Sequence, residues 1–153
     1  NVKRLGENLG YRVQVTPKGG EYILTMTKGS SADACCVRET CLSNDVIYVS
    51  TDKMGQGADD LGKILIKGYF YALTEVKPYP KTLIFVNSGV YLTTEGSEVL
   101  EYLKTLADQG VEIVSCGTCL DFYHLKDKLA VGSITNMYSI VEKMNGADKV
   151  IRV

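Results

Sequence analysis

The fold is decided by the stretch Leu83-Ile84-Phe85-Val86-Asn87-Ser88-Gly89, in which four apolar residues run directly into a small polar turn. A short apolar run that ends at turn residues is typical of a strand buried on both faces of a sheet. A second stretch has a similar plan, since residues 111–114 (Val-Glu-Ile-Val) precede Ser115-Cys116-Gly117-Thr118-Cys119. We therefore expect two buried strands, each followed by a loop that contains glycine.

Helical patterns surround these strands. Residues 46–49 form another strand-like run, and a glycine-rich turn at 54–58 leads to Asp59 and Asp60, which we expect to cap a helix. The apolar residues of this helix recur with the helical period, at Leu61, Ile64, Leu65, Tyr69, Ala72, Leu73 and Val76. A second helix is predicted to begin at Ser97 and to end at Gly110, with an apolar stripe formed by Val99, Leu100, Leu103, Leu106 and Ala107.

The same alternation continues to the end of the chain. We expect a short helical piece at 122–129, a last helix capped by Thr135 or Asn136, and a closing strand at 149–153. Strands that alternate with helices through short turns require right-handed crossovers between parallel strands. The predicted fold class is therefore α/β, with a mostly parallel open sheet and helices on both of its faces.

The first residues have a different pattern. Residues 1–9 resemble the last turns of a helix, while residues 11–15 and 22–26 are strand-like and flank a turn at 17–20, which predicts a β-hairpin. A helix end and one hairpin contain too few residues for a core of their own. We expect residues 1–28 to be a remnant of a larger domain or an appendage docked elsewhere, residues 29–44 to be a linker, and residues 45–153 to be the main domain.

Composition excludes several classes of protein. Seventeen basic and eighteen acidic side chains give a net charge of -1, so we expect no nucleic-acid partner and no binding to anionic membranes. The apolar runs at 82–86 and 111–114 are far shorter than the roughly 18 residues of a membrane-spanning helix. No secretory leader is expected after Val2-Lys3-Arg4. Five cysteines in two clusters indicate reduced thiols and a cytoplasmic location.

Three loops are expected at the carboxyl ends of the strands, where open α/β sheets bind their ligands. They lie at 54–58, 87–89 and 115–119, and glycines in each allow backbone N–H groups to form a concavity that binds anions. The same donors would favour a thiolate or a persulfide on Cys116. The predicted catalytic residues are Cys116 and Cys119. The predicted anion-binding residues are Gly55, Gly57, Asn87, Ser88, Gly89, Gly117 and Thr118.

Several alternatives stay open at this stage. Cys119 fits a role in packing as well as one in chemistry. The turn around Gly55 and Gly57 lacks Walker-type spacing, which weakens a phosphate-binding interpretation. His124, the single histidine, is not expected to act as a base. The cysteines at 35, 36 and 41 lack a second Cys-x-x-Cys knuckle for zinc, so we expect no metal site, and a thiol exchanging with Cys116 is the alternative.

Residues 45–153 resemble the DsrE-like domain of the YedF family of sulfurtransferase-like selenium metabolism proteins. The matching segments are 54–57 (Met-Gly-Gln-Gly), 60–63 (Asp-Leu-Gly-Lys), 85–90 (Phe-Val-Asn-Ser-Gly-Val), 115–120 (Ser-Cys-Gly-Thr-Cys-Leu) and 131–138 (Val-Gly-Ser-Ile-Thr-Asn-Met-Tyr). Residues 1–28 are similar to the C-terminal half of a TusA-like domain. The Cys-Pro-x-Pro motif of that domain does not occur in this chain.

The resemblance implies a sulfur or selenium carrier. In it, Cys116 would accept sulfane sulfur or selenium as a persulfide-type adduct and pass it to a protein partner, and Cys119 would resolve the adduct. It also implies a homo-oligomer that exchanges small sulfur or selenium species with donor and acceptor proteins, with no cofactor. Two other functions remain: a dithiol redox protein that uses Cys116 and Cys119, and a non-catalytic module that binds a small anion or a partner.

Overall fold

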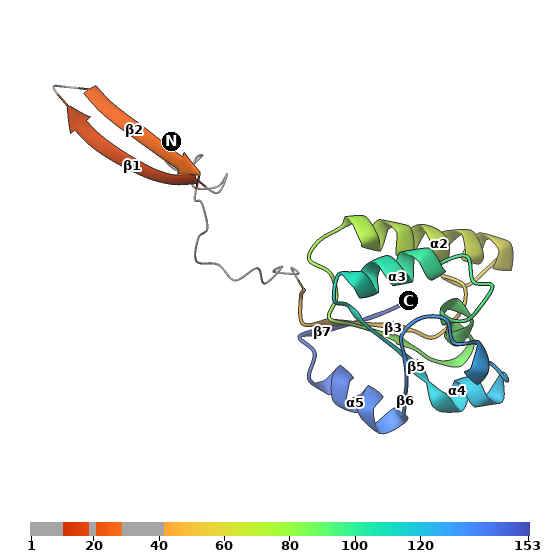
Figure 1. The fold of residues 1–153 in the computed structure, drawn as a ribbon. Coiled ribbons are helices and arrows are strands. Elements are labelled where there is room, and N and C mark those ends of the chain that lie inside the picture. The colour runs from red at the N-terminus through yellow and green to blue at the C-terminus, as the bar shows by residue number, and fades with distance from the viewer. Residues whose placement is uncertain (1–10, 19–20, 29–41) are drawn as a thin grey trace. The chain divides into compact units, whose positions relative to one another are not determined.

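The computed structural model describes residues 11–18, 21–28 and 42–153 (Figure 1). The chain divides into two units at Arg38 and Glu39. In the first unit, strands β1 (Tyr11–Lys18) and β2 (Glu21–Lys28) pair antiparallel, which confirms the predicted hairpin strands. The helical segment predicted at 1–9 and the cysteines at 35, 36 and 41 lie outside the described residues.

The second unit is built on a five-stranded parallel sheet in the order β6-β5-β4-β3-β7. Its strands are β3 (Asp45–Val49), β4 (Thr82–Phe85), β5 (Glu112–Cys116), β6 (Ser133–Thr135) and β7 (Lys149–Arg152). The parallel α/β fold predicted from the sequence is therefore confirmed. Strand β6 was not predicted, because three residues are too few to show a period of two.

Helices cover both faces of this sheet (Figure 1). The helices α2 (Asp59–Glu75) and α3 (Leu100–Asp108) lie on one face, and α5 (Met137–Asn145) lies on the other. The short helix α4 (Gly117–Phe122) follows β5 directly. Two 3₁₀ helices complete the unit, η1 (Asn87–Thr93) after β4 and η2 (Lys126–Lys128) after α4.

The sheet separates a large core from a small one. Between the sheet and α2 and α3, Phe70 stacks on Phe85 with ring centroids 5.9 Å apart, and both side chains are fully buried. On the opposite face, a smaller cluster contains Ile84, Cys116 and Ile140. Both faces of β4 are therefore buried, as its uninterrupted apolar sequence predicts.

Helix α2 buries a different face from the predicted one. Its buried residues are Gly62, Ile66 and Phe70, whereas much of the predicted stripe is exposed to solvent, namely Leu61, Ile64, Leu65, Ala72 and Val76. The helix has two apolar stripes, and the sequence period does not say which of them faces the sheet. The face that carries Phe70 is the buried one, because the ring of Phe70 packs on that of Phe85.

Four predicted boundaries also differ. The helix predicted to begin at Ser97 is α3, which begins at Leu100 with Val99 at its N-cap position. Asp59 and Asp60 lie in the first turn of α2, and the N-cap position is Ala58, which has no capping side chain. The helical piece expected at 122–129 begins earlier, at Gly117, because the chain turns into a helix as soon as β5 ends. Residues 42–44, assigned to the linker, join the second unit, where the Ser43 N–H donates to the Tyr79 carbonyl oxygen at 2.7 Å.

Other boundaries agree with the prediction. Asn136 caps α5, and its side-chain oxygen accepts the N–H of Ser139 at 3.0 Å. Gly110 follows α3 with a φ of 90°, a left-handed conformation that glycine adopts without strain.

Gly89 offers a test of how closely the β3 and β4 ends approach each other. A Cβ atom at Gly89 would lie 2.5 Å from the carbonyl oxygen of Val49, so backbone would have to shift. We expect Gly89→Ala to lower the free energy of unfolding by about 1–3 kcal/mol, measured by denaturant titration. Gly146→Ala is the matched control and should change the stability little, because its Cβ would lie 3.4 Å from the nearest atom, the carbonyl oxygen of Glu142. Equal stability of both variants would contradict the close approach.

Candidate thiol site

The two cysteines of the 115–119 segment differ in burial. Cys116 is the last residue of β5, and its side chain is only 2% exposed within the smaller core. Cys119 lies three residues later, in α4, and is partly buried at the edge of both cores. Both are free thiols. Cys119 is therefore the thiol that an approaching molecule meets first.

The turn after β4 provides a hydrogen-bond donor to this thiol. The backbone N–H of Asn87 donates to Cys119 Sγ at an N···S distance of 3.1 Å. Asn87 has a φ of 50°, a left-handed conformation that asparagine tolerates better than most residues. Because Phe85 of β4 pairs with Ser115 of β5, the segments that follow these two strands meet at one edge of the sheet.

A tyrosine that the sequence interpretation missed anchors this turn. The Tyr123 hydroxyl donates to Asn87 Oδ1 at 2.8 Å. Its ring also packs against Tyr91, with centroids 5.0 Å apart. Tyr123 follows Cys119 by four residues, the spacing that places two side chains on one helix face, and that spacing could have revealed it.

Burial governs the acidity of Cys119. Burial raises the pKa of this thiol, the N–H of Asn87 acts in the opposite direction, and the neighbouring Cys116 adds to the increase. The net result is a pKa above the ordinary value. The 87–89 loop thus provides an N–H donor to Cys119, whereas the sequence interpretation expected such donors at Cys116. Despite this donor, Cys119 is mainly a protonated thiol at neutral pH.

The other predicted ligand residues have structural roles or lie apart from the thiols. Gly117 and Gly89 allow close packing, since a Cβ at Gly117 would lie 3.0 Å from Ile134 Cγ2. Ser88 Oγ accepts the N–H of Asp52 at 3.4 Å, and Thr118 is exposed. Gly55 and Gly57, with φ values of 81° and 147°, shape the loop before α2, and no hydrogen bond among the described residues joins them to the thiols.

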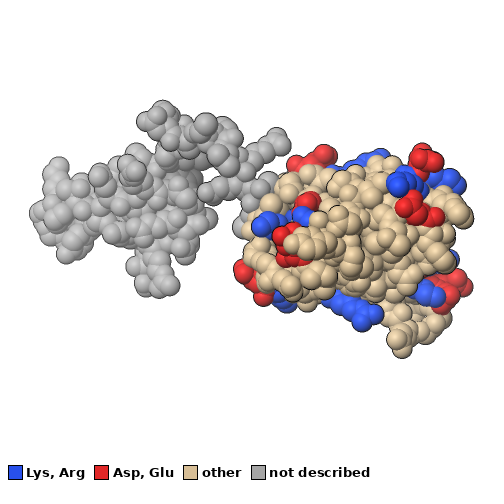
Figure 2. All heavy atoms as spheres, turned by 90° about the horizontal axis from the view of Figure 1, so that it is seen from below, with Lys and Arg blue, Asp and Glu red and all other residues tan. Residues whose placement is uncertain are grey.

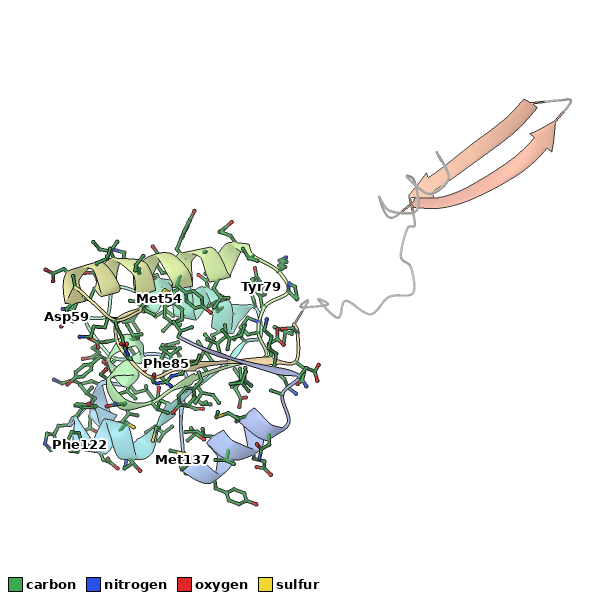
Figure 3. All side chains as sticks on the ribbon, turned by 180° about the vertical axis from the view of Figure 1, so that it is seen from behind. Met54, Asp59, Tyr79, Phe85, Phe122 and Met137 are labelled. Carbon is green, nitrogen blue, oxygen red and sulfur yellow. The ribbon has the colours of Figure 1, made fainter. Side chains whose placement is uncertain are left out.

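Exposed apolar side chains surround the thiol end of the sheet. Phe122 is 75% exposed, and Phe122 and Met137 both lie on the side of the sheet away from α2 (Figure 3). Seen from that side, the second unit shows a broad surface without charge, with charged side chains mainly at its margin (Figure 2). The exposed apolar side chains of α4, β6 and α5 are Phe122, Ile134, Met137, Tyr138 and Val141.

A cavity among the described residues lies apart from the thiols. It has a volume of about 700 Å³ and is lined by residues of α2, η1 and the 94–99 segment, together with Asp52, Leu125 and Lys128. Neither cysteine lines it, although Tyr91 does and also contacts Tyr123. Within residues 42–153, His124 is exposed and joins no cluster that could hold a metal ion. Helices in the described part of the chain are too short or too polar to cross a membrane.

Comparison with known proteins identifies the family. The sequence model of the DsrE/DsrF-like family matches residues 72–153, which include both cysteines and more than half of the chain. The chain belongs to the DsrE/DsrF-like family. Among curated proteins, none matches this sequence.

Solved structures share the fold of this DsrE/DsrF-like domain. The YchN protein of E. coli is 16% identical, with a TM-score of 0.51 over 71% of this chain and 98% of its own. MTH1491 from Methanobacterium thermoautotrophicum, of unknown function, is 18% identical, with a TM-score of 0.52 over 71% and 97%. BT1422 from Bacteroides thetaiotaomicron, also of unknown function, is 12% identical, with a TM-score of 0.51 over 72% and 95%. At these identities the likeness concerns the fold alone.

The difference in burial predicts a difference in reactivity. We expect iodoacetamide to modify Cys119 at least roughly tenfold faster than Cys116, measured by peptide mass spectrometry after timed pulses. Because the pKa of Cys119 is raised, its rate should still increase through the alkaline range, where an unperturbed thiol has levelled off. Faster labelling of Cys116, or a Cys119 rate already constant below pH 7, would contradict this description.

Proposed function

We propose that this DsrE/DsrF-like protein is a sulfur carrier that relays sulfane sulfur, or selenium, through a persulfide-type adduct on the Cys116 and Cys119 pair. The family is generally tied to sulfur relay. The observation that supports the proposal most directly is the partly buried Cys119 thiol with the N–H of Asn87 at 3.1 Å. A thiolate or persulfide anion at this position would be stabilised by that donor.

The difference in burial between the two thiols suggests which of them accepts the sulfur. The sequence interpretation assigned the persulfide to Cys116, whose side chain is 2% exposed. We propose instead that Cys119 receives the sulfur. Its thiolate attacks the outer sulfur of a donor persulfide, the S–S bond of the donor breaks, and the donor leaves as a thiolate. An acceptor thiolate then attacks the outer sulfur on Cys119 and restores the Cys119 thiolate.

Cys116 would act as the second thiol. If no acceptor arrives, the Cys116 thiolate can attack the inner sulfur of the Cys119 persulfide. This step forms a Cys116–Cys119 disulfide and releases hydrosulfide, so atoms and electrons balance. The neighbouring position of Cys116, which raises the pKa of Cys119, supports this role.

Partners and compartment belong to the same proposal. The exposed apolar side chains Phe122, Met137 and Tyr138 near the thiols would contact the donor and acceptor proteins. We also propose that residues 1–28 are the C-terminal part of a TusA-like domain and that the protein works in the cytoplasm, where thiols stay reduced. Selenium as the cargo, and the YedF family as the subgroup, rest on the sequence resemblance.

A second candidate function is that of a dithiol redox protein. It is favoured by the neighbouring positions of Cys116 and Cys119, three residues apart across the start of α4. Burial raises the pKa of Cys119, but Cys119 is the nucleophile in the sulfur relay as well, so this shift does not separate the two functions. A third candidate, a module that binds a small molecule, is favoured by the 700 Å³ cavity with Lys63, Lys67 and Lys128 in its lining.

Intact mass spectrometry separates these functions. Full-length protein would be incubated with a sulfane-sulfur donor, and separately with selenite and thiol. We expect a gain of one sulfur atom in the wild type, a loss of this gain in Cys119→Ala, and a longer-lived adduct in Cys116→Ala, because the resolving thiol is missing. A variant with Cys35→Ser, Cys36→Ser and Cys41→Ser is the matched control and should load like the wild type.

The other outcomes each point to a different function. Loading that disappears in Cys116→Ala but not in Cys119→Ala would return the carrier role to Cys116. A loss of two hydrogen atoms in the wild type would indicate the dithiol redox function only if Cys116→Ala also gains no sulfur, because resolution of a Cys119 persulfide leaves the same disulfide. No mass change in any sample would indicate the binding module.

A further inference from the structure

The cavity beside α2 has an apolar floor that belongs to the core. A space of about 700 Å³ adjoins side chains that are themselves buried, namely Ile66, Leu92, Val99 and Leu125. Pockets of roughly 300–1,000 Å³ with mainly apolar walls are typical of sites that enclose a small molecule. Both cysteines of the described residues lie outside the lining, so an occupant would not meet either thiol.

The charged side chains around this cavity balance one another. Three lysines and three carboxylates line it, and one of each is already paired, since Lys67 Nζ lies 2.8 Å from Glu98 Oε2. An ion of either sign would gain little from such a rim and would lose its hydration over the apolar floor. The cavity therefore favours a molecule without net charge. The other charged lining residues are Lys63, Lys128, Asp52 and Glu95.

Tyr91 gives the cavity an aromatic wall. Its side chain is 42% exposed, so part of the ring is free to contact an occupant. Aromatic rings attract one another beyond the area that they bury, in offset or edge-to-face geometry. An occupant with an aromatic ring thus fits both this wall and the apolar floor.

The other contacts of Tyr91 lead to the thiol site. Its ring centroid lies 5.0 Å from that of Tyr123, whose hydroxyl donates to Asn87 Oδ1 at 2.8 Å. The N–H of Asn87 in turn donates to Cys119 Sγ at 3.1 Å. Direct contacts therefore join the cavity wall to the thiol.

We propose that the cavity binds a small, uncharged aromatic molecule, and that this occupant increases the reactivity of Cys119 through the contact of Tyr91 with Tyr123. The inference goes beyond the proposed sulfur relay, because it applies to any reaction of the Cys119 thiol. In the relay, the occupant would act as an effector beside the thiol chemistry rather than in place of it.

The turn at Asn87 is the element that the occupant would stabilise. Its φ of 50° is uncommon for a residue other than glycine, and its hydrogen bond to Cys119 is exposed, so the turn can open. Burial raises the pKa of Cys119, and the N–H of Asn87 opposes this increase only while the turn is closed. A ligand shifts such an equilibrium if it binds one state better. The occupant does so by holding Tyr91 against Tyr123, whose hydroxyl keeps the turn closed.

Fluorescence titration of the full chain tests the binding site. The probe is N-phenyl-1-naphthylamine, which is uncharged and fluoresces in apolar surroundings, and its sulfonated analogue 8-anilinonaphthalene-1-sulfonate is the comparison. We expect saturable binding of the uncharged probe and at least about threefold weaker binding of the sulfonate. Ile64→Glu should weaken the binding about tenfold or more, because Ile64 lines the cavity. Leu61→Glu is the matched control, since Leu61 is also an exposed residue of α2 but lies outside the lining.

Timed iodoacetamide pulses at neutral pH test the effect on the thiol. We expect a saturating concentration of the uncharged probe to raise the alkylation rate of Cys119 about twofold or more in the wild type. Tyr123→Phe keeps a ring beside Tyr91 but removes the hydroxyl that donates to Asn87. This variant should bind the probe within about twofold of the wild type and show no increase in rate.

Circular dichroism shows whether each variant is folded. The proposed site would be overturned if the wild type shows no saturable binding, or if Ile64→Glu and Leu61→Glu bind the probe equally. Tighter binding of the sulfonate would overturn the ligand class. A Cys119 rate that the bound probe leaves unchanged, or raises equally in Tyr123→Phe, would overturn the effect on the thiol. Sulfur loading is measured without the probe, so its absence would reject the relay alone.

Discussion

The parallel pairing of β4 with β5 is the constraint on which the rest of the site depends. Phe85 is held opposite Ser115, so the chain leaves both strands at the same edge of the sheet. After β4 the chain enters the left-handed turn at Asn87, and after β5 it enters α4. The hydrogen bond from Asn87 to Cys119 links these two segments, and Tyr123 holds the turn from the far end of α4.

Much of this arrangement could be predicted from the sequence, for physical reasons. Strands β3, β4 and β5 are nearly continuous apolar runs, which is the pattern that a sheet covered on both faces requires. Strand ends of a parallel sheet share an edge, and this led to the expectation that Asn87 would lie near the thiols. The roles of the two thiols could not be predicted, because whether a side chain is exposed depends on where α4 begins relative to β5.

Helix α2 shows where periodicity stops being informative. A helix that has apolar residues on two of its faces gives a clear period but no orientation. The orientation is chosen by shape: Phe70 stacks on Phe85, and Gly62 admits the backbone of the preceding loop. Apolar side chains of α2 remain outside as well as inside, so the sequence period alone does not distinguish the core face from the exposed face.

The donor to Cys119 belongs to the main chain, and this has a consequence for how the site tolerates change. A side-chain donor disappears with a single substitution, whereas the N–H of residue 87 is present in every amino acid except proline. The site can therefore lose this donor only if the backbone leaves its left-handed conformation, with a φ of 50°. Residues that adopt this conformation readily, such as glycine and aspartate, would keep the donor in place. The hydrogen bond to this thiol thus depends on the backbone conformation at residue 87 rather than on the type of side chain there.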